Sequence, residues 1–275
     1  MSVAHDHRDI EIVCIDVDGT LVGARGEVSD AVWRAADDAR TRGVHLVLCS
    51  GRPAFGVTRT YAERLDANGW HVFQNGASVM DLGSGDTRSR AIPPALVSML
   101  VERSRQLQRP LELYTDATYA VELDTPRTRA HAALLGVPFE RRDLRSLREP
   151  VVRAQWLVSH AEAEQVLAEP HDGLTLSHSL SPVMPDASFI NVTPDGVDKA
   201  FAVRLVAETY GVPLERVMMV GDSANDISTM RIVGMAVAMG NAEPGVRDVA
   251  TTHVATVDED GLAEALALTT VETSS

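Results

Sequence analysis

The stretch Asp16-Val17-Asp18-Gly19-Thr20-Leu21 follows directly on an apolar run from Ile10 to Ile15. Such a run is typical of a strand that is buried on both faces of a parallel sheet. In an extended chain, side chains at i and i+2 share one face about 6.5–7 Å apart, so Asp16 and Asp18 are expected to project together beyond the strand end. They need a compensating cation, and Mg²⁺ prefers such oxygen ligands. An Asp-x-Asp-Gly sequence by itself also fits aspartates that only cap the following turn.

A second acidic stretch, Gly221-Asp222-Ser223-Ala224-Asn225-Asp226, ends another apolar run, Val217–Val220. Because the carboxyl ends of parallel strands meet at one edge of a sheet, we expect these oxygen ligands to lie beside Asp16. Two acidic strand ends fit one metal ion. The alternative is that a residue of this stretch only caps the helix expected after it, and this interpretation stays open for Asp226 taken alone.

A third strand end carries a hydroxyl instead of acids. The sequence Ser50-Gly51-Arg52-Pro53 follows the apolar run Val44–Cys49. A hydroxyl and free backbone N–H groups near the start of a helix favour binding of an anion. By itself this signal is weak.

Lys199 is the only lysine in a chain with 25 lysine and arginine residues in total. In a chain so rich in arginine, a surviving lysine suggests a place that requires a compact ammonium and not a planar guanidinium. The other interpretation is that this lysine escaped the bias by chance. Its position shortly before the second acidic stretch favours a site.

The order of the expected elements predicts an α/β fold. A helical pattern over 31–42 separates the first two apolar runs, and helices and strands alternate again from Lys199 onward. This alternation predicts a doubly wound, Rossmann-like parallel sheet with ligands beyond the carboxyl ends of its strands. Between Leu82 and Pro185 the expected strands come in pairs, which indicates an inserted α+β domain. We therefore predict a catalytic core at 1–82 and 186–275, with a cap domain at 83–185.

Together these sequences resemble a known family. The elements Asp-x-Asp-Gly-Thr, Ser-Gly-Arg, Gly-x-x-Lys and Gly-Asp-x-x-Asn-Asp, in this order, resemble motifs one to four of the haloacid dehalogenase superfamily. The position of the insert and the sequence Asn75-Gly76-Ala77 resemble the Cof-type phosphatases, which have an α/β cap of type IIB. The resemblance implies an enzyme, a phosphoric monoester hydrolase.

The resemblance also implies a role for each motif residue. Asp16 would be the nucleophile that forms an aspartyl-phosphate, and Asp18 the general acid and base, which requires a proton on Asp18 while Asp16 stays ionised. Lys199 would neutralise charge between Asp16 and the phosphate. The residues expected to hold Mg²⁺ are Asp16, Asp18 through its backbone carbonyl, Asp222 and Asp226. The residues expected to bind substrate are Ser50, Gly51, Arg52 and Asn225.

Two positions depart from the family pattern, because Ala200 follows the motif lysine and Asn191 stands where an acid is common. The cap would select the substrate, but its polar residues are weak candidates, since most such residues lie on a solvated surface or in a satisfied core. These candidates are Arg127, Arg129, His131, His178 and Ser181. Trp156 is expected in the core of the cap.

Composition limits the partners and the compartment. A net charge of −14 argues against nucleic acid and anionic membranes as partners. Cys14 and Cys49 lie in apolar runs and indicate buried free thiols, so a cytoplasmic protein is expected. No apolar run approaches the roughly 20 residues of a membrane span. We expect a monomer or homodimer that acts on a small-molecule phosphate monoester.

Three functions remain open at this point. The first is a Mg²⁺-dependent phosphatase for a small phosphorylated metabolite, with sugar phosphates as the leading class. The second is a phosphomutase that returns the phosphoryl group to the bound sugar. The third is a non-catalytic sensor of sugar phosphates, against which the intact motif set argues, since a binding module needs no acid and base at Asp18.

Overall fold

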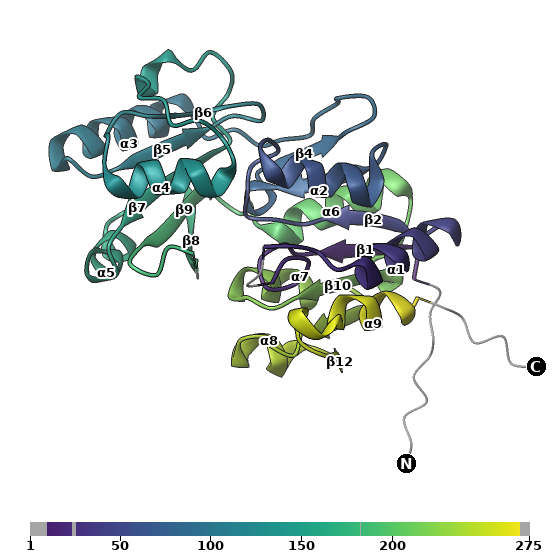
Figure 1. The fold of residues 1–275 in the computed structure, drawn as a ribbon. Helices are drawn as coiled ribbons and strands as arrows, with labels where there is room; N and C mark the ends of the chain where they lie inside the picture. The colour runs from purple at the N-terminus through teal and green to yellow at the C-terminus, as the bar shows by residue number, and fades with distance from the viewer. Residues whose placement is uncertain (1–9, 24–25, 182, 270–275) are drawn as a thin grey trace, which may run out of the picture.

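The computed structural model of the 275-residue chain describes residues 10–23, 26–181 and 183–269 (Figure 1). Its first sheet has five strands, all parallel. In spatial order these are β12 (Thr252–His253), β11 (Met235–Ala238), β10 (Val217–Gly221), β1 (Ile12–Ile15) and β2 (His45–Leu48). The strand order with β1 between β2 and β10 brings the three polar strand ends of the sequence to neighbouring places on one edge.

Both faces of this sheet are covered. Alternate residues of β1 enter two different cores, Val13 on one face and Ile12 on the other, and every residue of the strand has an exposed fraction of 0%. Helices of the first core are α1 (Asp30–Thr41), α2 (Val57–Asp66) and α9 (Gly261–Ala267). Helices of the second are α6 (Lys199–Tyr210), α7 (Ile227–Met230) and α8 (Pro244–Val249). The doubly wound core predicted from the sequence is thus confirmed.

The second sheet is antiparallel and also has five strands. In spatial order these are β6 (Tyr119–Val121), β5 (Leu111–Tyr114), β7 (Arg153–Val158), β9 (Ser188–Pro194) and β8 (Leu174–Leu180). Helices α3 (Pro94–Leu107) and α5 (His160–Ala168) share one core with it, and Trp156 lies in that core as expected. Helix α4 (Pro126–Leu135) contributes His131, which contacts Glu112 of β5. Figure 1 shows this inserted α+β unit beside the parallel sheet.

Strand β9 does not follow the predicted division of the chain. It pairs with β7 and β8 in the second sheet, although it lies beyond the predicted boundary at 185/186. The β-branched and aromatic residues of Ser188–Pro194 fit a strand of either sheet, and only its pairing partners decide between them. The exact domain boundaries therefore stay a prediction, with β9 moved to the side of the cap.

A small hairpin connects the two units. Strands β3 (Trp70–Phe73) and β4 (Ser78–Asp81) pair with each other, and a bridge between Cys49 and Val72 joins the hairpin to the first sheet. The turn between them, Gln74–Gly76, has positive φ at all three residues, 55°, 55° and 94°. Such angles are costly for residues other than glycine, so the surrounding contacts must hold this turn in place.

We predict that Gly76→Ala lowers stability more than an ordinary change at a left-handed glycine. A Cβ on Gly76 would lie 2.0 Å from the carbonyl oxygen of Asp198, whereas a Cβ on Gly85, also at positive φ, would meet nothing within 4 Å. The free energy of unfolding measured in urea should therefore fall by about 1–2 kcal/mol for Gly85→Ala, because only backbone strain is added. It should fall further for Gly76→Ala. Equal losses would mean that the turn moves freely away from Asp198.

Candidate active site

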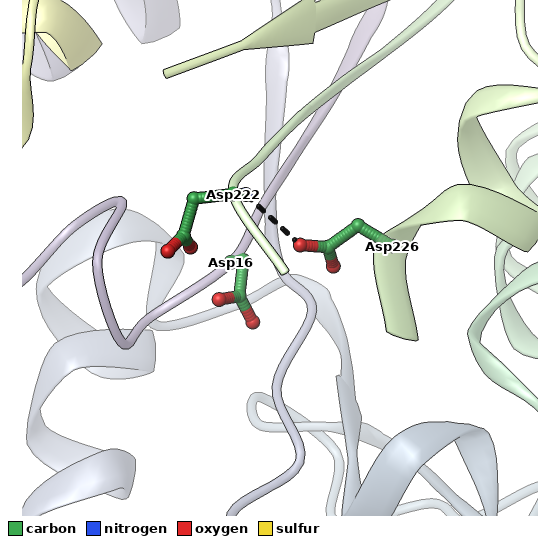
Figure 2. Close-up of side chains that lie close together, drawn as sticks. All are labelled: Asp16, Asp222 and Asp226. Carbon is green, nitrogen blue, oxygen red and sulfur yellow. Dashed lines mark hydrogen bonds between the residues drawn. The ribbon is translucent and has the colours of Figure 1, made fainter. Parts of the chain in front are cut away.

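The predicted site residues lie at the carboxyl edge of the parallel sheet. Asp16 follows β1, Asp222 follows β10, and Ser50 lies shortly after β2. Asp226 ends a short 3₁₀ turn, Ala224–Asp226. Figure 2 shows Asp16, Asp222 and Asp226 gathered in one place from these separate segments.

Lys199 is the centre of this group. It is the first residue of α6, after Asp198, whose side chain accepts a hydrogen bond from the backbone N–H of Phe201. Its Nζ lies 2.6 Å from Oδ1 of Asp16 and 2.6 Å from Oδ1 of Asp226. The ammonium is completely buried. Lys199, whose position in the sequence favours a site, therefore contacts acidic residues of both acidic stretches in the structure.

Three carboxylates offer ligand atoms to one cation. Oxygens of Asp16, Asp222 and Asp226 lie within 4.8 Å of one another. Oδ2 of Asp226 accepts hydrogen bonds from the backbone N–H groups of Asp222 and Ser223, so this aspartate also caps the turn, as the sequence allowed (Figure 2). Oδ1 of Asp222 accepts a bond from the hydroxyl of Thr20 at 3.1 Å. One ammonium does not balance three carboxylates, so the donor set fits a divalent metal ion.

Burial is the main reason why the pKa values of two of these carboxyl groups are raised. Burial raises the pKa of Asp16 to about 7, although Lys199 opposes this shift. Burial, reinforced by Asp16, raises the pKa of Asp222 to about 8. Burial alone would lower the pKa of Lys199, but Asp16 and Asp226 outweigh it and raise the pKa. A bound divalent cation would return both carboxyl groups to their ionised form, because it supplies the missing positive charge.

Asp18 differs from its neighbours. Its carboxylate is 58% exposed, is not a member of the group of three, and forms a two-pronged ion pair with Arg52, with Nε of Arg52 2.9 Å from Oδ2. The acid and base role of Asp18 stays a prediction. A metal contact through the backbone carbonyl of Asp18 stays a prediction.

The turn of the small hairpin and the last motif are joined through one asparagine pair. Nδ2 of Asn225 donates to Oδ1 of Asn75 at 3.0 Å, and the hydroxyl of Ser223 donates to Oδ1 of Asn225 at 2.8 Å. Asn225 is thus engaged with protein groups, and contact with substrate stays a prediction for it. Ser50 is buried, and its Oγ accepts a bond from the backbone N–H of Arg52 at 3.0 Å.

Sequence reasoning missed two residues at the site. In the sequence, Thr20 stands out only as part of the first motif, and Asn241 lies outside all four motifs. Nδ2 of Asn241 donates to the carbonyl of Gly19 at 2.8 Å. Asn241 follows β11, whose carboxyl end lies at the same sheet edge. That position in the series of strand ends was the signal that could have found it.

The cap candidates lie apart from the acidic group in their contacts. Arg129 pairs with Asp124 on the surface, and His178 is exposed. His131 is buried, with Nδ1 2.8 Å from Oε2 of Glu112. Burial alone would raise the pKa of Glu112, but His131, Tyr114 and Arg153 together outweigh it, so that pKa lies below its usual value. For Arg127 and Ser181 a role stays a prediction.

A doubly wound sheet with an acidic cluster and a buried lysine at its carboxyl edge, plus an inserted α+β cap, defines a class of phosphate-handling hydrolases. The chain belongs to the haloacid dehalogenase-like hydrolase family, whose profile matches residues 13–266. Within it, the chain is of the Cof type with a type IIB cap, and it is a phosphoric monoester hydrolase.

Relatives of similar length support this assignment. The chain is 27% identical to the 5-amino-6-(5-phospho-D-ribitylamino)uracil phosphatase YcsE of Bacillus subtilis, with 97% of this chain and 98% of the relative covered. A haloacid dehalogenase-like hydrolase from Bacteroides thetaiotaomicron matches with a TM-score of 0.83 at 26% identity, covering 94% and 98%. A subclass IIB sugar phosphatase matches with a TM-score of 0.80, covering 94% of this chain and 98% of the other, and at 22% identity this match shows the fold alone.

Among the described residues, no helix is long and apolar enough to cross a membrane.

Proposed function

We propose that this hydrolase is a Mg²⁺-dependent phosphatase that cleaves a small phosphorylated metabolite through an aspartyl-phosphate on Asp16. The observation that carries the proposal is the position of Lys199, whose Nζ lies 2.6 Å from both Asp16 and Asp226. An ammonium buried between carboxylates has little structural purpose, because buried ion pairs seldom stabilise a fold on balance. Its value lies in offsetting charge where a phosphate dianion meets a carboxylate.

The residues divide the reaction between them. The carboxylate of Asp16 attacks phosphorus, and the bond to the leaving oxygen breaks while Asp18 gives that oxygen a proton. Asp18 then takes a proton from water, which attacks the aspartyl-phosphate and releases inorganic phosphate and free Asp16. Lys199 stays charged throughout, and Ser50 binds a phosphoryl oxygen. Asp16, Asp222 and Asp226 would hold Mg²⁺, which supplies charge stabilisation at the phosphoryl group.

The name of one relative supports a substrate class. The relative YcsE is named as a phosphatase for 5-amino-6-(5-phospho-D-ribitylamino)uracil, which carries its phosphate on a ribityl chain. We propose a sugar or sugar-alcohol phosphate as the substrate here. The buried free cysteines Cys14 and Cys49 support a cytoplasmic location.

We predict that inorganic phosphate is released from a sugar or sugar-alcohol phosphate in Mg²⁺, that excess EDTA stops release, and that Mg²⁺ restores it. Ca²⁺ should restore it poorly, because Ca²⁺ prefers more ligands at longer distances than a compact site provides. A screen of phosphorylated metabolites with the Asp16→Asn variant as the blank measures this. Turnover at full rate in EDTA would overturn the metal assignment, and a requirement for a bisphosphorylated activator would favour a mutase.

A further inference from the structure

The loop Ser50–Arg52 is held through its three carbonyl oxygens. The carbonyl of Ser50 accepts a bond from the N–H of Asn75 at 3.0 Å, and that of Arg52 from the N–H of Gln74 at 2.9 Å. The middle carbonyl, that of Gly51, accepts a bond at 3.1 Å from Nη1 of Arg153. The first two donors belong to the turn of the small hairpin, whereas the third is a side chain of β7 in the cap.

The guanidinium of Arg153 is itself firmly oriented. Only 3% of the residue is exposed, and its Nε donates to Oε1 of Gln74 at 3.1 Å. Nη1 also lies 2.6 Å from Oδ1 of Asn191 and 3.0 Å from Oε1 of Gln155, so its two hydrogens are shared among three acceptors. The guanidinium carbon lies 4.1 Å from the centre of the Tyr114 ring. Every one of these acceptors is neutral, so the group is fixed by geometry and not by an ion pair.

The cap sheet supports this orientation. Glu112, Gln155 and Asn191 lie directly opposite one another on β5, β7 and β9, so they form a row on one face of the sheet. Nε2 of Gln155 donates to Glu112 at 3.0 Å, and this bond turns the oxygen of Gln155 toward Arg153. The place of the guanidinium is thus determined by the cap and by Gln74 of the hairpin turn, and not by the loop that it contacts.

The contact with Gly51 fixes more than one oxygen. In a planar trans peptide the C=O and the following N–H point in opposite directions. The carbonyl of Gly51 and the N–H of Arg52 belong to one peptide unit, and that N–H donates to Oγ of Ser50 at 3.0 Å. Because glycine tolerates most backbone angles, this peptide would otherwise rotate at little cost. Such a rotation would remove the bond that orients the Ser50 hydroxyl.

We propose that Arg153 is a positioning residue that locks the Gly51–Arg52 peptide and thereby orients Ser50 for phosphate binding. The inference rests on the proposed role of Ser50 in holding a phosphoryl oxygen. It makes the affinity of the core for phosphate depend on a side chain of the cap. Gln74 supports the same junction, since its Nε2 donates to the carbonyl of Thr115 in the cap at 2.9 Å.

The test compares wild type, Arg153→Met, Arg153→Lys and the control Arg109→Met in the presence of Mg²⁺. Arg109 is likewise a buried cap arginine, 7% exposed, but it pairs with Glu169 and contacts Trp156 instead of the loop. The measurements are kcat and KM for the best substrate of the screen, the competitive inhibition constant of inorganic phosphate, and the melting temperature.

Arg153→Met should weaken inhibition by phosphate about tenfold or more, the size expected when a hydrogen bond from a charged group is lost. Arg153→Lys should remain impaired, because one ammonium on a flexible stem does not replace a planar fork with several fixed donors. Arg109→Met should lower the melting temperature and leave phosphate inhibition unchanged. If Arg153→Met does not fold, the lysine variant carries the comparison.

Four results would overturn the inference. An unchanged inhibition constant in a folded Arg153 variant would show a merely structural role, and a raised KM with unchanged phosphate inhibition would show a contact with the leaving group. Full recovery in Arg153→Lys would show that charge alone matters. A wild type that hydrolyses its substrate but is not inhibited by phosphate would refute the Ser50 assignment first, and the inference with it.

Discussion

Asp16→Asn should abolish phosphate release, with kcat lowered by roughly 10⁴-fold or more, as when an enzyme loses the atom that forms its covalent intermediate. An amide oxygen is too weak a nucleophile to attack a phosphate dianion. The geometry needs little change, because asparagine has nearly the shape of aspartate and its oxygen still accepts the bond from Lys199. The loss should therefore appear in kcat and in single-turnover labelling of the protein, and not in the fold.

Stability provides the second half of this prediction. Three carboxylates share one ammonium in the site, and burial raises the pKa of Asp16 to about 7. Removing one carboxylate reduces the repulsion among those that remain, so the variant in EDTA should melt at the same temperature as wild type or higher. Added Mg²⁺ should raise its melting temperature less than that of wild type, since one ligand charge is lost.

A matched control separates the site from the surface. Asp37 is an exposed aspartate that pairs with Arg40 and Arg64, and Asp37→Asn should leave both kcat and the response to Mg²⁺ unchanged. Residual turnover of Asp16→Asn within tenfold of wild type would refute the nucleophile assignment.

The sequence was informative wherever the signal was local. A strand buried on both faces reads as an apolar run, and the polar residues directly after it must lie at its end, which placed Asp16 and Asp222 correctly. Helix α6 begins at Lys199, the first residue of the predicted helix, because Asp198 caps it. Convergence at the sheet edge then follows from topology alone.

Contacts between residues far apart in the chain could not be predicted from the sequence. The positive φ angles of Gln74 and Asn75 could not be predicted, because neither residue is a glycine. Hydrogen bonds with residues far away in the chain hold them in this conformation. The contact of Arg153 with Gly51 joins residues 102 positions apart and depends on how the cap is seated. The same holds for the ion pair of Asp18 with Arg52, which the motif pattern did not indicate.

Lys199→Met should lower kcat by about 10²–10³-fold, the usual cost of removing one preorganised group that stabilises transition-state charge. The same change should make Mg²⁺ bind more tightly, because the ammonium that competes with the metal for Asp16 is gone. Lys199→Arg should keep the charge but still lose turnover, since a planar guanidinium does not fit a fully buried space in which one nitrogen lies 2.6 Å from two carboxylates.

A fall in kcat together with a rise in Mg²⁺ affinity distinguishes a catalytic ammonium from a structural one. If Lys199 only held the fold, its removal would leave buried carboxylates unpaired and weaken everything together, including metal binding. Arg204→Met, at an exposed position of the same helix, should change neither quantity. Initial rates and a Mg²⁺ titration followed by melting temperature measure both. A Lys199→Arg variant with nearly normal kcat would show that the chemistry needs only a positive charge there, and the requirement for a compact ammonium would fail.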